Sequence, residues 1–144
     1  MTTTAITART TTTSTSTSTS AVVKTVAAAT ALAAVAVEAV VAIANAVGPD
    51  VTLQGQAMPT GGSAIGVLMC MVPAIALLAG LRRWAATPAR AWLRTTVVLT
   101  ALSVVPDLTV ADTPVASRLT LMAAHVVAAA IIVPAVARAL RPQR

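Results

Sequence analysis

The sequence predicts an all-α integral membrane protein, a four-helix bundle connected up-down-up-down with both termini in the cytoplasm. Three observations predict this fold class. Hydrophobic residues make up 57% of the 144 residues and charged residues only 10%, whereas soluble domains carry roughly 25% charged residues. Four apolar runs divide the chain as transmembrane helices would. Finally, lysine and arginine gather in segments that would all lie on one side of a membrane.

The chain begins with a tract of threonine and serine, residues 1–21, which has nothing apolar to bury and is predicted to be a disordered cytoplasmic tail. The transmembrane domain is expected over residues 22–140. Its first helix, residues 25–47, is long enough to cross a hydrocarbon core of about 30 Å. A cleaved signal peptide is the alternative for this run, but its length and the charge of Glu38 favour a helix that stays in the protein.

Three further helices follow. A polar, turn-rich loop leads into the second helix, residues 63–81, and a basic loop then leads into the third, residues 95–110. The third run is the shortest. The fourth helix is expected over residues 119–137, before a basic C-terminal tail at residues 141–144.

Orientation follows from the distribution of lysine and arginine, which favours the cytoplasmic side. The N-terminal tail with Lys24 carries two of these residues, the middle loop four and the C-terminus three, whereas the other two loops hold only Arg118. The sequence therefore predicts a multi-pass protein of the cell membrane with its N-terminus, middle loop and C-terminus in the cytoplasm.

The same distribution accounts for the net charge of +6 without a nucleic-acid partner. The chain has no Phe or Tyr to stack on a base and no nucleic-acid-binding motif. A single cysteine, Cys70, excludes an internal disulfide and a cysteine-based metal site. With no nucleophile–base pair and no metal cluster, we expect neither an enzyme nor a bound metal or cofactor.

The two tryptophans are expected to anchor the protein at the lipid headgroups. Trp84 and Trp92 both lie in the basic middle loop, and indole prefers the membrane interface. The arginines beside them favour contact with anionic headgroups. These arginines are Arg82, Arg83, Arg90 and Arg94.

Three ionisable residues inside the predicted helices stand at nearly one depth. Glu38 lies 14 residues beyond Lys24, Asp107 lies 13 beyond Arg94, and His125 lies 13 before Arg138. Each is thus about 20 Å from the basic side, in the outer part of the bilayer. A charged side chain in a spanning helix costs roughly 2.5–3.5 kcal/mol, so we expect these residues to form a polar layer inside the bundle.

Other polar residues support this layer. Thr96, Thr100 and Ser103 share one face of the third helix with Asp107, and Asn45 shares a face of the first helix with Glu38. Two interpretations stay open. The layer is either a small site, open to the outside, that binds or relays a proton, or a set of interhelical hydrogen bonds that hold alanine-rich helices together.

Gly62 and Gly66 form a GxxxG pattern at the start of the second helix. Small residues on one ridge permit close helix contact. A homo-oligomer through these glycines is therefore an expected mode of assembly.

The segment Ser103–Leu108 and the stretch Leu121–Arg138, in which His125 precedes Pro134 by nine residues, resemble a family of small actinobacterial membrane proteins catalogued as a domain of unknown function. The resemblance extends over about residues 22–140. It implies a four-helix fold and brings no known activity or ligand, and Glu38 is not carried over from it.

Function is therefore expected to be non-enzymatic, as a structural or interaction subunit of the membrane. The alternative is a small proton-linked transporter or carrier that uses the polar layer.

Overall fold

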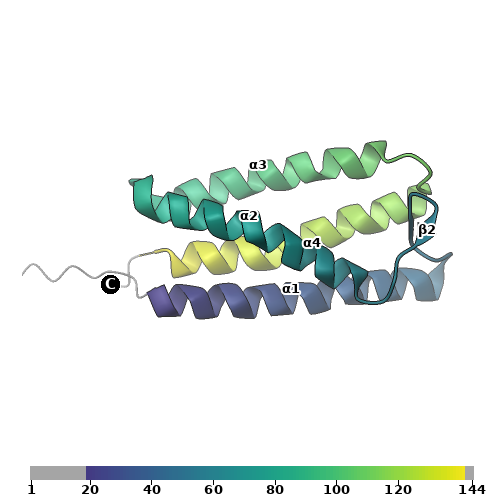
Figure 1. Cartoon of the computed structure of the whole chain (residues 1–144), viewed down its shortest axis with the longest axis horizontal. Helices are drawn as coiled ribbons and strands as arrows, with labels where there is room; N and C mark the ends of the chain where they lie inside the picture. Colours follow the sequence, from purple (N-terminus) through teal and green to yellow (C-terminus); the bar gives the residue numbers. More distant parts are fainter. Residues whose placement is uncertain (1–18, 142–144) are drawn as a thin grey trace, which may run out of the picture.

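A computed structural model describes residues 19–141 of the chain, with the exception of the side chain of Asp107. Residues 1–18 of the tail predicted at residues 1–21, and the last residues, 142–144, lie outside the described part, whereas residues 19–21 belong to the first helix. The elements follow in the order α1 (Thr19–Val47), β1 (Thr52–Leu53), β2 (Gln56–Ala57), α2 (Gly62–Trp84), α3 (Pro88–Thr109) and α4 (Val115–Ala139) (Figure 1). The described chain is thus all-helical apart from one short hairpin, as the sequence predicts.

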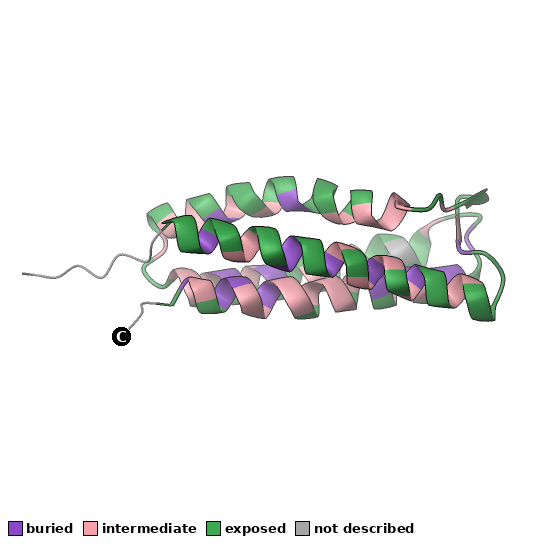
Figure 2. Ribbon diagram, turned by 90° about the horizontal axis from the view of Figure 1, so that it is seen from below, coloured by how far each residue is buried: buried purple, intermediate pink, exposed green. Residues whose placement is uncertain are grey.

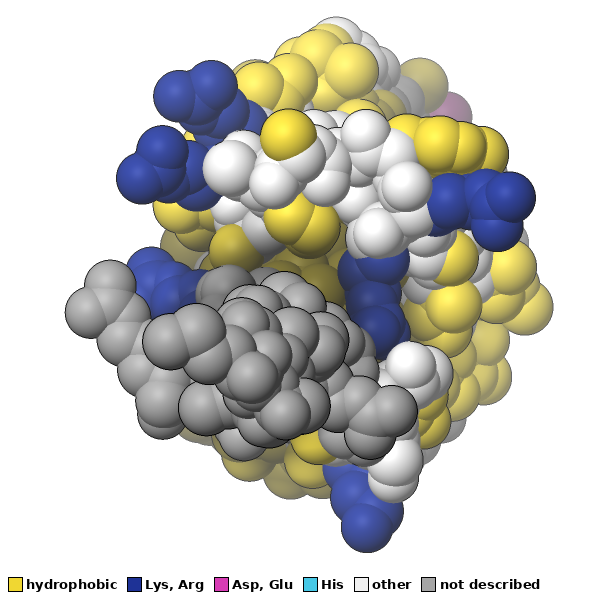
Figure 3. Space-filling model, turned by 90° about the vertical axis from the view of Figure 1, so that its left-hand side faces the viewer, with side chains coloured by type: hydrophobic (Ala, Val, Ile, Leu, Met, Phe, Trp, Pro, Cys, Tyr) yellow, Lys and Arg dark blue, Asp and Glu magenta, His cyan; other side chains and the backbone are white. Residues whose placement is uncertain are grey.

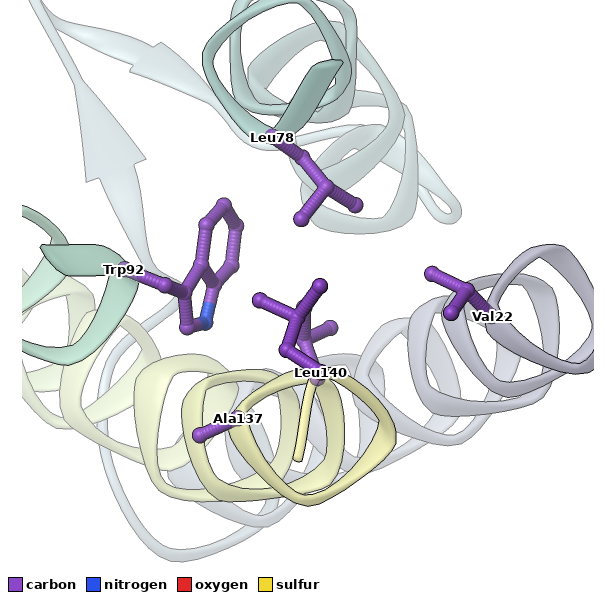
Figure 4. Packing of buried hydrophobic residues seen from close by; sticks show 6 residues of the cluster. Val22, Leu78, Trp92, Ala137 and Leu140 are labelled. Carbon is purple, nitrogen blue, oxygen red and sulfur yellow. The ribbon is translucent and has the colours of Figure 1, made fainter. Parts of the chain in front are cut away.

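Consecutive helices run in opposite directions. A cluster of buried side chains joins the beginning of α1 (Val22), the end of α2 (Leu78), the beginning of α3 (Trp92) and the end of α4 (Leu140), as Figure 4 shows. Lysines and arginines lie at the same end of the bundle, which we call the basic end (Figure 3). Its basic residues are Lys24, Arg82, Arg83, Arg90, Arg94, Arg138 and Arg141.

The hairpin lies at the opposite end of the bundle, which we call the hairpin end. β1 and β2 pair antiparallel through Thr52–Ala57 and Leu53–Gln56. The turn residues Gln54 and Gly55 both have positive φ, of 52° and 73°, which is the backbone of a type I′ turn. The sequence predicts only a polar loop here, because Gln-Gly is a weaker turn signal than Asn-Gly or Asp-Gly.

The core of the bundle is narrow and built from small residues. α4 packs most extensively against α1 and α3, whereas α2 is attached mainly to α1. The buried residues of α1, among them Ala29, Ala33, Val37 and Val41, recur at four-residue spacing. They therefore form one inward stripe, which is the pattern of a helix that buries a single face.

Most large apolar side chains of α2 and α3 lie on the outside of the bundle. Figure 2 shows exposed residues over much of the outer surface of the bundle. Leu68, Met69 and Val72 of α2, and Val98 and Leu102 of α3, all expose more than half of their surface. A soluble protein seldom exposes so continuous an apolar surface.

Three helices are long and apolar enough to cross a membrane, namely α1, α2 and α4. The third run does not reach this level, because the observed helix α3 includes Arg90, Arg94 and several threonines. The sequence predicts four spans; the length and composition of the observed helices support three.

The helices are also longer than expected, and the basic middle loop is shorter. α2 continues through Arg82 and Arg83 to Trp84, and α3 already begins at Pro88, so that only residues 85–87 connect them. Arginines in the last turn of α2 favour the helix because they complement its negative end. Proline is well suited to the first position of α3, where its missing N–H has no helical partner to lose.

Candidate functional site

Glu38 lies half-buried in the middle of α1 and faces the beginning of α2. Its carboxylate accepts three hydrogen bonds: from the hydroxyl of Ser63 at 2.5 Å, from the backbone N–H of Ala64 at 2.9 Å and from that of Gly61 at 3.4 Å. All three donors belong to the N-terminus of α2. The carboxylate of Glu38, the only glutamate of the chain, thus lies at the N-terminal end of α2.

This arrangement follows from what the start of α2 lacks. Its N-cap is Gly61, which has no side chain, and its first turn contains no acidic residue. The first N–H groups of a helix have no partner within the helix, and they carry a partial positive charge. A carboxylate from another helix supplies both an acceptor and a negative charge, so Glu38 caps α2 from outside.

Arg118 performs the opposite task at the end of α3. Its guanidinium donates to the carbonyl oxygens of Leu108 at 3.0 Å and of Val110 at 2.8 Å. α3 has no basic residue in its own last turn, and the carbonyls at a helix C-terminus favour a positive charge. An anion and a cation in the hairpin half of the bundle therefore cap two helix ends that lack caps of their own.

Side chains of α1, α4 and the α3–α4 loop fasten the hairpin to the bundle. Each accepts a hydrogen bond from a backbone N–H of residues 51–54, and Val51 is only 2% exposed. The bonds run from Val51 N to Asn45 Oδ1 at 2.8 Å, from Thr52 N to Ser117 Oγ at 3.1 Å and from Gln54 N to Thr113 Oγ1 at 3.1 Å. Asn45, predicted as part of the polar layer, therefore holds the hairpin.

The polar stripe of α3 bonds mainly to its own helix. The hydroxyl of Thr96 donates to the carbonyl oxygen of Trp92 at 2.7 Å, and that of Ser103 donates to Thr100 at 2.8 Å. Thr96 is buried, and Thr100 and Ser103 are half-buried. The side chains of this stripe are thus at least half-buried, and these hydroxyl bonds are made within α3.

His125 is half-buried on α4, where its Nδ1 lies 3.0 Å from the carbonyl oxygen of Leu121. The side chain of Asp107 lies outside the described part of the chain. A meeting of Glu38, Asp107 and His125 in one layer accordingly stays a prediction. What the structure adds is the set of partners of Glu38, Ser63 foremost, which the sequence analysis did not identify.

The two tryptophans differ from each other, which corrects one expectation. Trp84 is 79% exposed, as suits an interfacial anchor. Trp92 is only 1% exposed and lies in the buried cluster (Figure 4). Its indole N–H donates to the carbonyl oxygen of Val133 at 3.2 Å. Trp92 is therefore a core residue that joins α3 to α4 instead of a side chain presented to the lipid.

The two glycines of the GxxxG pattern, Gly62 and Gly66, differ in the space around them. A Cβ at Gly62 would lie 3.3 Å from the side chains of Met58 and Pro59, whereas a Cβ at Gly66 would meet nothing within 4 Å. Packing within the chain thus leaves room around Gly66. Within residues 19–141, no three side chains of His, Cys, Asp or Glu lie close enough to hold a metal ion.

The family model described as "Family of unknown function (DUF6069)" matches residues 17–142, which include all four helices. No curated protein and no solved structure matches the chain.

Proposed function

Because this chain belongs to the DUF6069 family of unknown function, we propose its role from its own residues. It is an integral protein of the cell membrane that crosses the bilayer four times and acts as a structural or interaction subunit without catalysis. The observation that carries this proposal is the distribution of polarity. Apolar side chains face outward along the helices, whereas the charges of Glu38 and Arg118 are bound to helix ends within the bundle.

That distribution suits a lipid solvent. Ionisable side chains between transmembrane helices are costly unless other protein groups pair with them. Glu38 has such partners at the start of α2 and Arg118 at the end of α3, although Nε of Arg118 is buried without a hydrogen-bond partner. In the bilayer, acyl chains cover the exposed leucines, valines and methionines of α2, so these side chains are not in contact with water.

α3 crosses with the others although it is the least apolar helix. The first turns of α3, which include Trp92, lie at the basic end, and its C-terminal carbonyl groups lie beside Arg118 at the hairpin end. α3 therefore runs the length of the bundle between α2 and α4. If α2 and α4 span the bilayer, their connection must span it too. The hydroxyls of Thr96 and Ser103 are bonded to the helix backbone, which lowers the cost of this passage.

The basic end is the cytoplasmic end in this proposal. Seven of the lysines and arginines of the described chain stand there, while Asp50, Asp112 and Arg118 stand at the hairpin end. Cytoplasmic enrichment of lysine and arginine favours this orientation.

A proton-linked carrier remains the alternative function, and the surroundings of Glu38 weigh against it. A carboxylate that relays a proton has to change partners during transport. Glu38 instead holds three donors at the start of α2, where loss of its charge would weaken the helix end.

Orientation and insertion can be tested in one experiment. In a Cys70→Ser background, single cysteines at Gln56 and Ala86, both exposed, are labelled in intact cells with an impermeant maleimide, after the protein has been shown to resist extraction by alkaline carbonate. We expect label at position 56 and none at position 86 until the membrane is opened. The reverse pattern would overturn the orientation, and extraction by carbonate would overturn the membrane assignment.

A further inference from the structure

A groove of about 720 Å³ opens between α1 and α2. Along most of its length it is apolar, lined by residues such as Val23 and Ala27 of α1 and Leu68 and Val72 of α2. These two helices are held together at the hairpin end by Glu38 and, toward the basic end, by the buried cluster. Val22 and Leu78 of that cluster also line the groove, which therefore borders the core, and its walls suit hydrocarbon.

One end of the groove is polar. Thr19 and Arg82 line its mouth at the basic end, where Nη2 of Arg82 lies 3.4 Å from the hydroxyl oxygen of Thr19 and donates to it. From Arg82 to Leu68 the groove follows 14 residues of α2, or about 21 Å. A single leaflet contributes about 15 Å of the hydrocarbon core. The groove is thus long enough to hold one acyl chain that extends from the basic side.

Charge favours an anion at this mouth. Lys24 on α1 and Arg83 on α2 belong to the same end of the bundle as Arg82, and several separate basic side chains are visible at this end in Figure 3. A guanidinium binds phosphate through two parallel hydrogen bonds. Basic pockets between transmembrane helices on the cytoplasmic side bind anionic headgroups.

We propose that the α1–α2 groove is a binding site for one anionic phospholipid of the cytoplasmic leaflet. One acyl chain lies along Leu68, Val72 and Ala27, and the phosphate lies beside Arg82 and Thr19. A second copy of the chain suits the groove less well. Both copies would insert with the same orientation, so their basic ends would repel each other. The site rests on the proposed membrane insertion and goes beyond it by naming a ligand.

Lipid retention tests the charged mouth. The full chain is extracted in mild detergent from vesicles of phosphatidylcholine and phosphatidylglycerol, and the lipids that stay bound are measured by native mass spectrometry. The wild type should retain phosphatidylglycerol in preference to phosphatidylcholine. Arg82→Gln should lower retained phosphatidylglycerol about fivefold, the effect of one near-surface cation, and leave phosphatidylcholine unchanged. Arg90→Gln, a matched arginine of the basic end that does not line the groove, should behave as wild type.

Variants that fill the groove with a larger side chain test whether an acyl chain lies in it. Ala79 lines the groove, whereas Ala76, three residues earlier on α2, does not. Ala79→Leu should therefore lower lipid retention and Ala76→Leu should not; Ala27→Leu, on the facing helix, repeats the test. Circular dichroism checks that each variant keeps the helical content of the wild type.

The outcomes separate this site from the proposed function. If Arg82→Gln and Arg90→Gln lowered retained phosphatidylglycerol equally, the lipid would be attracted by the charge of the basic end in general, and this result would overturn the site. Normal lipid retention in both Ala79→Leu and Ala27→Leu would also overturn it, as would a change of oligomeric state in these variants without loss of lipid. Failure to insert into vesicles contradicts the membrane assignment itself, and this is seen before any lipid is measured.

Discussion

Glu38 and Ser63 are 25 positions apart in the chain, and a hydrogen bond of 2.5 Å joins the carboxylate of one to the hydroxyl of the other. The bond ties the middle of α1 to the first turn of α2. Because Ala64 donates its backbone N–H to the same carboxylate oxygen, the charge that is most expensive to place in α1 stabilises the start of α2.

Replacement of Glu38 should therefore destabilise the bundle in a graded way. Glu38→Ala leaves the donors at the start of α2 unpaired, which should cost about 1–3 kcal/mol. Glu38→Gln keeps an acceptor oxygen and loses only the charge, which should cost about 0.3–1 kcal/mol. Unfolding by SDS titration in mixed micelles measures both. Asp50→Asn, in an exposed loop, is the control and should change stability by less than about 0.5 kcal/mol.

The same two variants decide between the open functions. If the protein is a proton-linked carrier, Glu38→Gln should abolish the pH-dependent proton flux into liposomes although the protein still folds. The structural role predicts instead that stability falls in the order wild type, Glu38→Gln, Glu38→Ala. Equal stability in all three proteins would contradict the capping role.

A double-mutant cycle isolates the bond itself. Loss of Glu38 and of Ser63 together, in Glu38→Ala/Ser63→Ala, should cost less than the sum of the single losses, with a coupling of about 0.5–3 kcal/mol. Trp92 lies at the other end of the bundle, so Glu38→Ala combined with Trp92→Phe should be additive within about 0.5 kcal/mol. Additivity in the first pair would mean that the short bond contributes nothing.

Helix composition explains which parts of this fold the sequence predicts. Four apolar runs predict four helices in their observed order, because burial in a bundle or in lipid needs continuous apolar surface. The expected bounds are too short at the basic end, since arginine and tryptophan read as a loop but are good residues for helix ends. The hairpin escapes prediction because its turn residues, Gln54 and Gly55, form a weak signal.

The partners of Glu38 escape prediction for a different reason. Backbone N–H groups have no residue type, so a carboxylate that binds them leaves no pattern of its own in the sequence. The indirect signal is the lack of any acidic residue or capping side chain at Gly61–Gly62. The inward position of Trp92 had a clearer signal, because Trp92 continues the stripe of Thr96, Thr100 and Ser103 at helical spacing.

Arg118 should matter as much as Glu38 for stability. Arg118→Met removes both hydrogen bonds to the end of α3 and should cost about 1–3 kcal/mol in the same SDS titration. Arg118→Lys keeps the charge, but a single ammonium does not reproduce the fork that reaches Leu108 and Val110, so an intermediate loss is expected. A Lys variant as stable as wild type would show that charge alone stabilises this end.

The two tryptophans should differ in fluorescence quenching. In Trp92→Phe the remaining Trp84 is exposed, and aqueous acrylamide should quench it strongly. In Trp84→Phe the remaining Trp92, 1% exposed, should be protected. Trp92→Phe should also cost about 1 kcal/mol, since the carbonyl oxygen of Val133 loses its indole donor. Equal quenching of both variants would contradict the buried position of Trp92.

Gly66 provides a test of assembly through the GxxxG pattern. A side chain at Gly66 meets no atom of its own chain within 4 Å, so Gly66→Leu should leave the stability of the monomer nearly unchanged. If copies associate through this ridge, leucine should separate them, because close helix contact needs small residues on both sides. Crosslinking in liposomes at several protein-to-lipid ratios measures the association.

Gly80→Leu is a poor control, since a Cβ there lies 3.2 Å from Trp84. Ala76→Leu, on the same helix beyond the pattern, is the better one. Unchanged crosslinking in Gly66→Leu would exclude the glycine ridge as the interface.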